Sequence, residues 1–200
     1  MVQIPDANGV PDLGALFDRY KERLRRTVRL RLDRRLVGLV DSSGVLKRVR
    51  GEVLRRGDEL AGSGRPDPFL WLRRITGEVL AQLHQERLGP DVRGDISLYR
   101  GALPEATSVS LAAHLLGRGG GEDDQAAVRA EQKLLLQEAL NAMDPLDREV
   151  LTLRHCEQLS NDETATVLGI PKSQASETYI RALKRITLIL AALPGFKGKP

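Results

Sequence analysis

The chain has 200 residues, is 41% hydrophobic but only 4% aromatic, and carries a formal net charge of +4. This size and composition suit one or two small domains with hydrophobic cores. The single cysteine, Cys156, excludes an internal disulfide framework, and no apolar run approaches the roughly twenty residues of a membrane span. Residues 1–13 lack the features of a signal peptide, so we expect a cytoplasmic protein with no membrane segment.

Long alternating runs of Val, Ile and Thr are missing, which favours an all-α protein: two small helical domains joined by a flexible linker, the second with a helix-turn-helix. The first domain is predicted over residues 10–88. Its opening helix, residues 13–36, has apolar residues at four-residue spacing: Leu16, Tyr20, Leu24 and Val28. After a break at residues 38–44, a second helix ends at Gly57 and is marked by three valines: Val45, Val49 and Val53.

Residues 57–68 are rich in Gly and Pro and are predicted to be a loop, and a third helix follows over residues 69–88. Between residues 17 and 56, basic side chains far outnumber acidic ones. Such a patch is typical of phosphate-binding proteins, although a solvated helical face has the same composition.

Composition changes over residues 89–125, which are rich in Gly, Ser, Pro and Asp and are predicted to form an interdomain linker with at most a short helix at residues 108–116. Residues 126–193 are predicted to form the second domain, and residues 194–200 a polar tail.

The second domain contains paired helix signals at helix-turn-helix spacing. Asp144 is a good N-cap and Pro145 suits the first helical position. Ser160 and Glu163 match a capping box, and Gly169 is a typical C-cap. A third helix is predicted over residues 171–193, with an apolar side made of Ala175, Tyr179, Ala182, Leu183, Ile186 and Leu190. This arrangement is the one that places a recognition helix in the DNA major groove.

Other chemistries find no support. His84, His114 and His155 are scattered and, with one cysteine, lack zinc-ligand spacing. The glycines at residues 117–121 are not followed by the Gly-Lys-Ser/Thr of a phosphate-binding loop. We therefore expect no metal, no cofactor, no catalytic residue and no enzymatic activity.

Two sets of motifs, in the right order, resemble a known family. Residues 140–155 (Leu-Asn-Ala-Met-Asp-Pro-Leu-Asp-Arg-Glu-Val-Leu-Thr-Leu-Arg-His), 157–170 and 181–185 resemble region 4 of extracytoplasmic-function RNA polymerase sigma factors. Residues 16–20 (Leu-Phe-Asp-Arg-Tyr), 29–33 and 68–75 (Pro-Phe-Leu-Trp-Leu-Arg-Arg-Ile) resemble region 2 of that family. The likeness covers nearly all of the chain, and region 4 is its most specific part.

The resemblance implies an alternative sigma factor that directs bacterial RNA polymerase to specific promoters. Its partners would be promoter DNA and core RNA polymerase, at the clamp and the flap, and an anti-sigma factor is a further candidate. One departure supports an alternative: residues 44–53 (Gly-Val-Leu-Lys-Arg-Val-Arg-Gly-Glu-Val) stand where the family usually has an acidic, glutamine-containing stretch that meets the clamp. The alternative is a degenerate sigma-like protein that binds DNA or a regulator without supporting initiation.

Carried over to this sequence, the resemblance also implies site residues. Contacts of the recognition helix with DNA would come from Lys172, Ser173, Gln174, Ser176, Glu177, Arg181 and Lys184. Contacts with the separated strand would come from Arg73, Arg74 and Arg87, and contacts with polymerase from Asp41, Val45, Arg48, Val49 and Glu52. Phe69 and Trp71 have two interpretations, base stacking or core packing, and core packing is favoured for Trp71.

Overall fold

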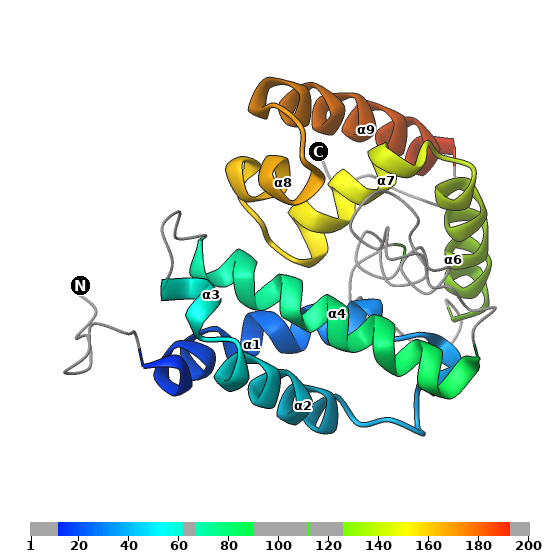
Figure 1. The fold of residues 1–200 in the computed structure, drawn as a ribbon. Coiled ribbons are helices and arrows are strands. Elements are labelled where there is room, and N and C mark those ends of the chain that lie inside the picture. Colours follow the sequence, from blue (N-terminus) through cyan, green and yellow to red (C-terminus); the bar gives the residue numbers. More distant parts are fainter. Residues whose placement is uncertain (1–11, 62–66, 90–111, 113–125, 193–200) are drawn as a thin grey trace. The chain divides into compact units, whose positions relative to one another are not determined.

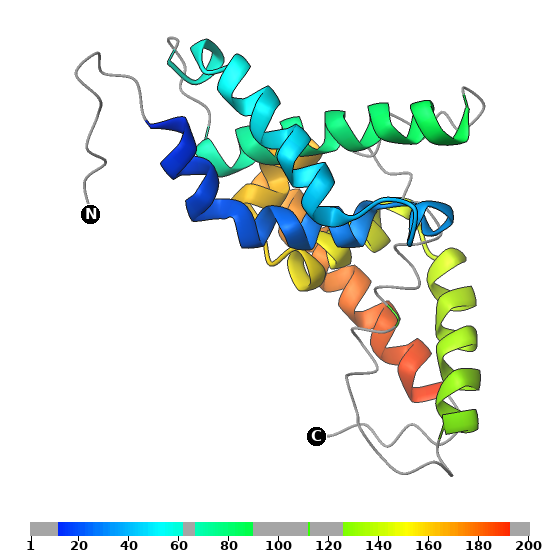
Figure 2. The same cartoon turned by 90° about the horizontal axis from the view of Figure 1, so that it is seen from below.

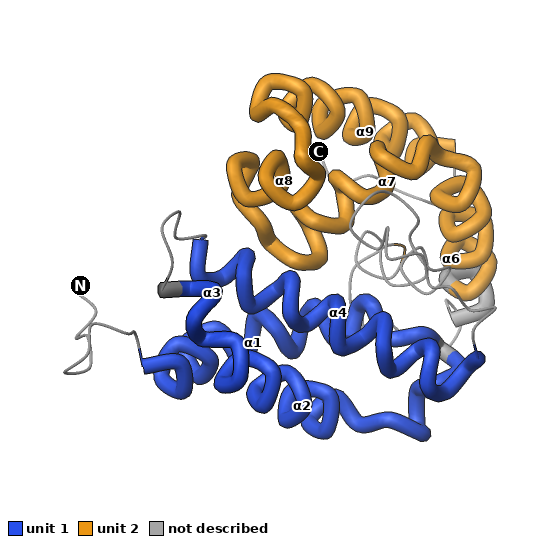
Figure 3. The backbone as a smooth tube through the Cα atoms, in the orientation of Figure 1, with its two compact units in different colours: residues 1–96 blue, residues 97–200 orange. Residues whose placement is uncertain are grey.

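The computed structural model describes residues 12–61, 67–89, 112 and 126–192. Within these ranges every regular element is a helix, apart from one isolated bridge between Val37 and Val40, so the all-α prediction is confirmed. Two compact units divide the chain, residues 1–96 and residues 97–200 (Figure 3). The predicted linker, its short helix and the tail lie outside the described residues, apart from Gly89 and the buried Ala112.

Unit 1 is built on three long helices that pack against one another: α1 (Leu13–Arg31), α2 (Ser42–Arg55) and α4 (Pro68–Leu88) (Figure 1). Each contributes one apolar side to a shared core, as the four-residue spacing predicts. Side chains that are fully buried there include Leu24, Val28, Val49, Val53, Leu72 and Ile75. Asp67 caps α4, because its carboxylate accepts a hydrogen bond from the Leu70 N–H at 2.9 Å.

The first helix is shorter than predicted. It ends at Arg31, where Leu32 becomes extended, and a short 3-10 helix follows at Arg34–Leu36. The cause is local: the Asp33 carboxylate accepts a hydrogen bond from the Arg35 N–H at 2.9 Å, and this offers the backbone an alternative to the helical ladder. The prediction of one helix over residues 13–36 was therefore wrong at its last turn.

Two further boundaries differ from prediction. The second helix, α2, starts inside the predicted break, at Ser42, and ends at Arg55 rather than Gly57. The predicted loop over residues 57–68 contains a single helical turn, α3 (Asp58–Ala61), which buries Leu60 to 5% exposure. Burial of one leucine in unit 1 is a tertiary effect that the Gly/Pro content of the segment does not reveal.

Unit 2 contains α6 (Ala126–Asn141), α7 (Pro145–Leu151), a π-helical turn (Thr152–Cys156), α8 (Asn161–Leu168) and α9 (Lys172–Ala192). The long helix α9 contacts α6, α7 and α8 (Figures 1 and 2). The core side chains include Leu136, Leu140, Val150, Leu151, Leu153, Ala182 and Ile186. The guanidinium of the buried Arg148 donates to the Leu140 carbonyl at 3.1 Å, which satisfies the end of α6.

Two kinds of site are missing from the described residues. No helix there is both long and apolar enough to cross a membrane. No group of three or more His, Cys, Asp or Glu side chains there is placed to hold a metal ion.

Candidate nucleic-acid interface

The first helix of the candidate interface, α7, begins as its sequence predicts. Asp144 lies in the N-cap position, and its carboxylate accepts hydrogen bonds from the N–H groups of Leu146 at 2.9 Å and Asp147 at 3.3 Å. Pro145 occupies the first helical position, where a missing N–H costs nothing. After α7 the chain continues through the π-helical turn, and Gln158 takes a left-handed φ of 59° that redirects the backbone.

The second helix, α8, is fixed at both ends by local chemistry. The Ser160 hydroxyl accepts from the Glu163 N–H at 3.1 Å, and the Glu163 carboxylate accepts from the Ser160 N–H at 2.7 Å, so the predicted capping box is confirmed. At the other end Gly169 has φ 65°, and the Ile170 N–H donates back to the Ala165 carbonyl at 3.1 Å. This left-handed end turns the chain into α9.

A side-chain link fastens the start of α8 to the start of α9. The Asn161 amide donates to the Lys172 carbonyl at 3.1 Å, and the Lys172 ammonium pairs with Asp162 at 2.5 Å. Ala165 is buried in α8, which packs against α9. The starts of α8 and α9 are thus joined by polar contacts as well as by packing.

Helix α9 buries one side in unit 2 and exposes the other. The fully buried positions are Ala175, Thr178, Ala182 and Ile186. Tyr179, which the sequence placed on this side, is only half-buried, and its hydroxyl lies 3.2 Å from the His155 ring nitrogen Nε2. Thr178, rather than Tyr179, belongs to the buried side of α9, because it lies three residues after Ala175 and four before Ala182 on the same side of the helix.

Arg181 links two helices of unit 2. Its Nε–H donates to the two carboxylate oxygens of Asp147 at 3.0 and 3.2 Å, and this contact ties α9 to α7. The Asp147 side chain is only 2% exposed, whereas the Arg181 side chain is 59% exposed. Hydrogen bonding to this carboxylate raises the pKa of Arg181 above its usual value. The guanidinium is therefore occupied by a structural contact.

Four of the predicted DNA-contacting residues are exposed, and their side chains have no hydrogen bond or ion pair in the described part of unit 2: Ser173, Gln174, Glu177 and Lys184. Ser176 is half-buried, and Lys172 has the partner described above. Sequence reasoning missed Arg185, which is exposed beside Lys184. Arg185 lies four residues after Arg181 and so on the same side of the helix, and this spacing could have identified it from the sequence.

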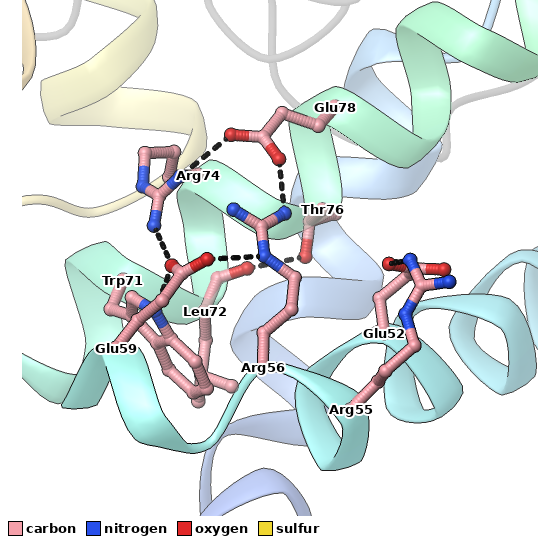
Figure 4. Close-up of polar contacts among 9 residues, drawn as sticks. All are labelled: Glu52, Arg55, Arg56, Glu59, Trp71, Leu72, Arg74, Thr76 and Glu78. Atoms are coloured by element: carbon pink, nitrogen blue, oxygen red, sulfur yellow. Dashed lines mark hydrogen bonds and ion pairs between the residues drawn. The ribbon is translucent and has the colours of Figure 1, made fainter. Parts of the chain in front are cut away.

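The three arginines of unit 1 that were predicted to contact a DNA strand differ in their exposure and in their partners. Arg73 is buried at 3% exposure, so the prediction that it contacts a DNA strand is contradicted. Arg74 is exposed but pairs with Glu59 at 2.5 Å and with Glu78 at 2.8 Å (Figure 4). Arg87, near the end of α4, is exposed.

The carboxylate of Glu59 is the centre of this polar network. It accepts from Arg56 Nε at 2.6 Å, from the Trp71 indole N–H at 3.1 Å and from Arg74, and Arg56 also pairs with Glu78 (Figure 4). The hydrogen bond from Arg56 is the main reason, with that from Trp71 next, that the pKa of Glu59 falls to about 2. Two arginines and two glutamates thus neutralise one another on this surface.

The aromatic residues of α4 pack in the core. Trp71 is 2% exposed and Phe69 1%, so the preference for core packing of Trp71 is confirmed and base stacking on either ring is contradicted. Phe69 contacts Tyr20 with ring centroids 5.5 Å apart, and the Arg23 guanidinium lies 3.5 Å from its centroid.

The predicted polymerase-contacting residues divide between core and surface. Val45 and Val49 are buried at 1% and 0% exposure against α1 and α4, so they cannot form an outer surface, and the prediction for them is wrong. Three-residue and four-residue spacing places them on the core side of α2. Asp41 is exposed, Arg48 pairs with Glu86 at 2.9 Å, and Glu52 is half-buried and paired with Arg55.

The chain is similar to known proteins, most specifically in unit 2. The family model described as "Sigma-70, region 4" matches residues 133–186. The RNA polymerase sigma-E factor of Streptomyces avermitilis is 29% identical over 171 residues, which cover 85% of this chain and 82% of that protein. The sigma-E factor of Streptomyces coelicolor is 38% identical over 69 residues, 34% of this chain and 39% of that protein.

A co-crystal structure of the sigma factor RpoE with the anti-sigma factor NepR from Bartonella quintana aligns with 90% of this chain and 98% of that chain, at a TM-score of 0.49 and 15% identity. A likeness this weak carries no information about sites or partners. The region 4 match runs from within α6 to within α9 and includes the capped helices and the left-handed turn of unit 2. Residues 133–186 are thus similar to region 4 of sigma-70 factors, and most of the chain is similar to a sigma-E factor.

Proposed function

We propose that this protein is an alternative sigma factor that binds core RNA polymerase and directs it to a specific set of promoters. The observation that carries the proposal is the helix-turn-helix of α7 to α9 within the region 4 match. Such a protein acts by binding and makes or breaks no covalent bond, so it needs no cofactor. Its partners are in the bacterial cytoplasm, where we place it, and an anti-sigma factor is a further partner to test.

In this proposal the exposed side of α9 contacts the upstream promoter element. Ser173 and Gln174 lie in its first turn, the part of a recognition helix that reaches base edges. Glu177 adds an acceptor of the kind that reads the cytosine amino group, and it repels phosphate. Lys184 and Arg185 supply the positive charge further along the helix and would contact phosphates, which fix position rather than sequence.

Fewer residues of unit 1 than the sequence predicted remain proposed contacts with polymerase or DNA. Asp41, Arg48 and Glu52 remain proposed contacts with core polymerase, since their side chains reach the surface of α2 or its N-terminus. Arg87 remains a proposed contact with the separated strand. Arg74 joins it only if DNA phosphate displaces Glu59 and Glu78 from its guanidinium, because both carboxylates bind it now.

A second function has a specific observation in its favour. Arg73 and Trp71 are buried and Arg74 is bound by two glutamates, so strand-capturing groups are scarce on the described part of unit 1. This favours the alternative that the protein binds DNA or a regulator through unit 2 without supporting initiation.

Retention of core polymerase separates the two functions. The tagged full chain is incubated with core enzyme beside a control sigma factor, and the retained complex is then used for run-off transcription on promoters recovered by genome-wide occupancy. Retention with run-off product supports the sigma factor. Failure to retain core enzyme while the control succeeds would defeat it.

Base reading by α9 has its own test with a matched control. Gln174→Ala is expected to relax the sequence preference at one promoter position. The binding free energy for promoters with the preferred base should weaken by about 1–3 kcal/mol. Gln85→Ala makes the same change at an exposed position of α4 in the other unit and should leave DNA affinity unchanged. Equal effects of the two substitutions would contradict the assignment of α9 as the reading helix.

A further inference from the structure

The connection between α1 and α2, residues 32–41, is attached to α4 by a buried histidine. The Asp33 N–H donates a hydrogen bond to the His84 ring nitrogen Nε2 at 3.2 Å, and His84 is 2% exposed. Asp33 follows Leu32, where the backbone has left the helix and become extended. The imidazole therefore satisfies a backbone N–H that no longer has a carbonyl of α1 as its partner.

Two leucines pack the same connection into unit 1. Leu32 is 7% exposed and Leu36 is 1% exposed, whereas Val37 and Leu39 point away from the core. The inner side of the connection is thus held by apolar packing and by the hydrogen bond to His84. Of these contacts, the hydrogen bond is the one that depends on a titratable group.

This hydrogen bond requires the neutral form of His84. A backbone N–H can only donate, so Nε2 must carry a lone pair and the ring proton must lie on Nδ1. Protonation places a hydrogen on Nε2, and two donors then face each other at the Asp33 N–H. The bond is lost, and an imidazolium charge is left at a position that is almost fully buried.

The surroundings of His84 favour the neutral ring. Burial is the main reason that the pKa of His84 lies below its ordinary value of 6.5. The Asp33 carboxylate opposes this shift, and the Arg35 guanidinium adds to it. Asp33 is itself hydrogen-bonded to Arg35, which lowers the pKa of that carboxyl, so it stays ionised while His84 titrates.

The other charged groups at this end of α1, α2 and α4 do not titrate in the same range as a histidine. They are carboxylates and guanidiniums, which keep their charge between about pH 5 and 8. His84 is the only histidine among residues 1–96. These neighbouring charged residues are Arg29, Arg31, Asp41, Arg48, Glu86 and Arg87, of which Arg48 and Glu86 pair with each other.

We propose that His84 is a proton-sensitive latch on the connection between α1 and α2. The neutral ring holds the connection to α4, and protonation releases the segment that carries Leu32 and Leu36. The latch lies within unit 1, so the inference does not depend on the binding of promoter DNA by unit 2 or on the binding of polymerase.

The direction of the pH effect follows from the lowered pKa of His84. The unfolded chain binds this proton more readily than the folded chain, so the stability that the latch confers is complete above pH 6.5 and falls as the pH decreases below it. Uptake of one proton on unfolding raises the unfolding equilibrium constant by up to about tenfold per pH unit. Urea unfolding followed by Trp71 fluorescence measures this change in unit 1, because Trp71 is the only tryptophan.

His84→Gln is the test variant, because a side-chain amide oxygen can accept from the Asp33 N–H but does not titrate. We expect the wild type to lose stability in unit 1 between about pH 7.5 and 5.5, and His84→Gln to lose little. The control is His155→Gln, which removes a histidine of unit 2 and should keep the wild-type pH dependence. Equal pH dependence in the wild type and His84→Gln, or none in either, would overturn the proposal.

A measurement on the wild-type chain keeps the proposal testable if His84→Gln does not fold. In the isotope-labelled full chain, nuclear magnetic resonance detects the coupling between the Asp33 amide nitrogen and His84 Nε2 across the hydrogen bond. We expect the coupling to disappear as the pH falls, with at least about tenfold faster hydrogen exchange of the Asp33 amide after correction for its intrinsic rate. A coupling that persists through the titration of His84, or a proton on Nε2 at neutral pH, would contradict the latch.

Discussion

Replacing Arg181 by methionine tests whether this residue supports the fold of unit 2 or binds DNA. The substitution removes the donors to Asp147 and leaves a carboxylate that is 2% exposed without its partner. A hydrogen bond to a charged group contributes about 1.5–3 kcal/mol, and the low end applies because the Arg181 side chain is 59% exposed. We therefore expect a loss of about 1.5 kcal/mol in the free energy of unfolding.

Urea unfolding of the full chain provides the assay. Trp71 is the only tryptophan and lies in unit 1, so its fluorescence monitors that unit, whereas far-UV circular dichroism monitors both. Arg181→Met should move the dichroism transition to lower urea and leave the fluorescence transition unchanged. In a double-mutant cycle with Asp147→Asn, the coupling energy should be about 1 kcal/mol.

The salt dependence of promoter binding completes the test. The logarithm of the affinity falls linearly with the logarithm of the salt concentration, and each phosphate contact makes this slope steeper by about 0.9. Lys184→Met should reduce that slope by about this amount, while Arg181→Met should change it little. If Arg181→Met lowered the slope as Lys184→Met does and left stability unchanged, the assignment of Arg181 to a structural contact would be refuted.

Three further predictions concern stability. Ser160→Ala removes the hydroxyl of the capping box and should cost about 1 kcal/mol in thermal or urea unfolding; a cost near zero would mean that the cap does not hold α8. Gly51→Ala should stabilise unit 1 by up to about 1 kcal/mol, because alanine favours helix and its Cβ meets nothing within 4 Å; destabilisation would contradict the exposure of that position. The folded pKa of Glu59, about 2, lies below its ordinary value of 4.5, so the stability that its charge confers is present above pH 4.5 and is lost as the pH falls toward 2. Glu59→Gln should flatten unfolding free energy against pH in that window, and an unchanged acid profile would count against the network.

The sequence by itself determined the local features of this protein. The cap at Asp144, the capping box at Ser160 and the left-handed turn at Gly169 depend on side chains within a few residues of the backbone groups that they satisfy, so short-range chemistry predicted them. The apolar spacing of α1 and α2 likewise predicted which sides of these helices are buried.

Only the tertiary structure decided which polar groups are available. Arg73 and Arg74 are adjacent in sequence, yet one is buried and the other is bound by Glu59, a residue of α3 that sequence reasoning placed in a loop. Arg181 is bound by Asp147, which is 34 residues away. An exposed cation and an ion-paired one look alike in a sequence, because the difference depends on long-range packing that brings the carboxylate within a hydrogen bond.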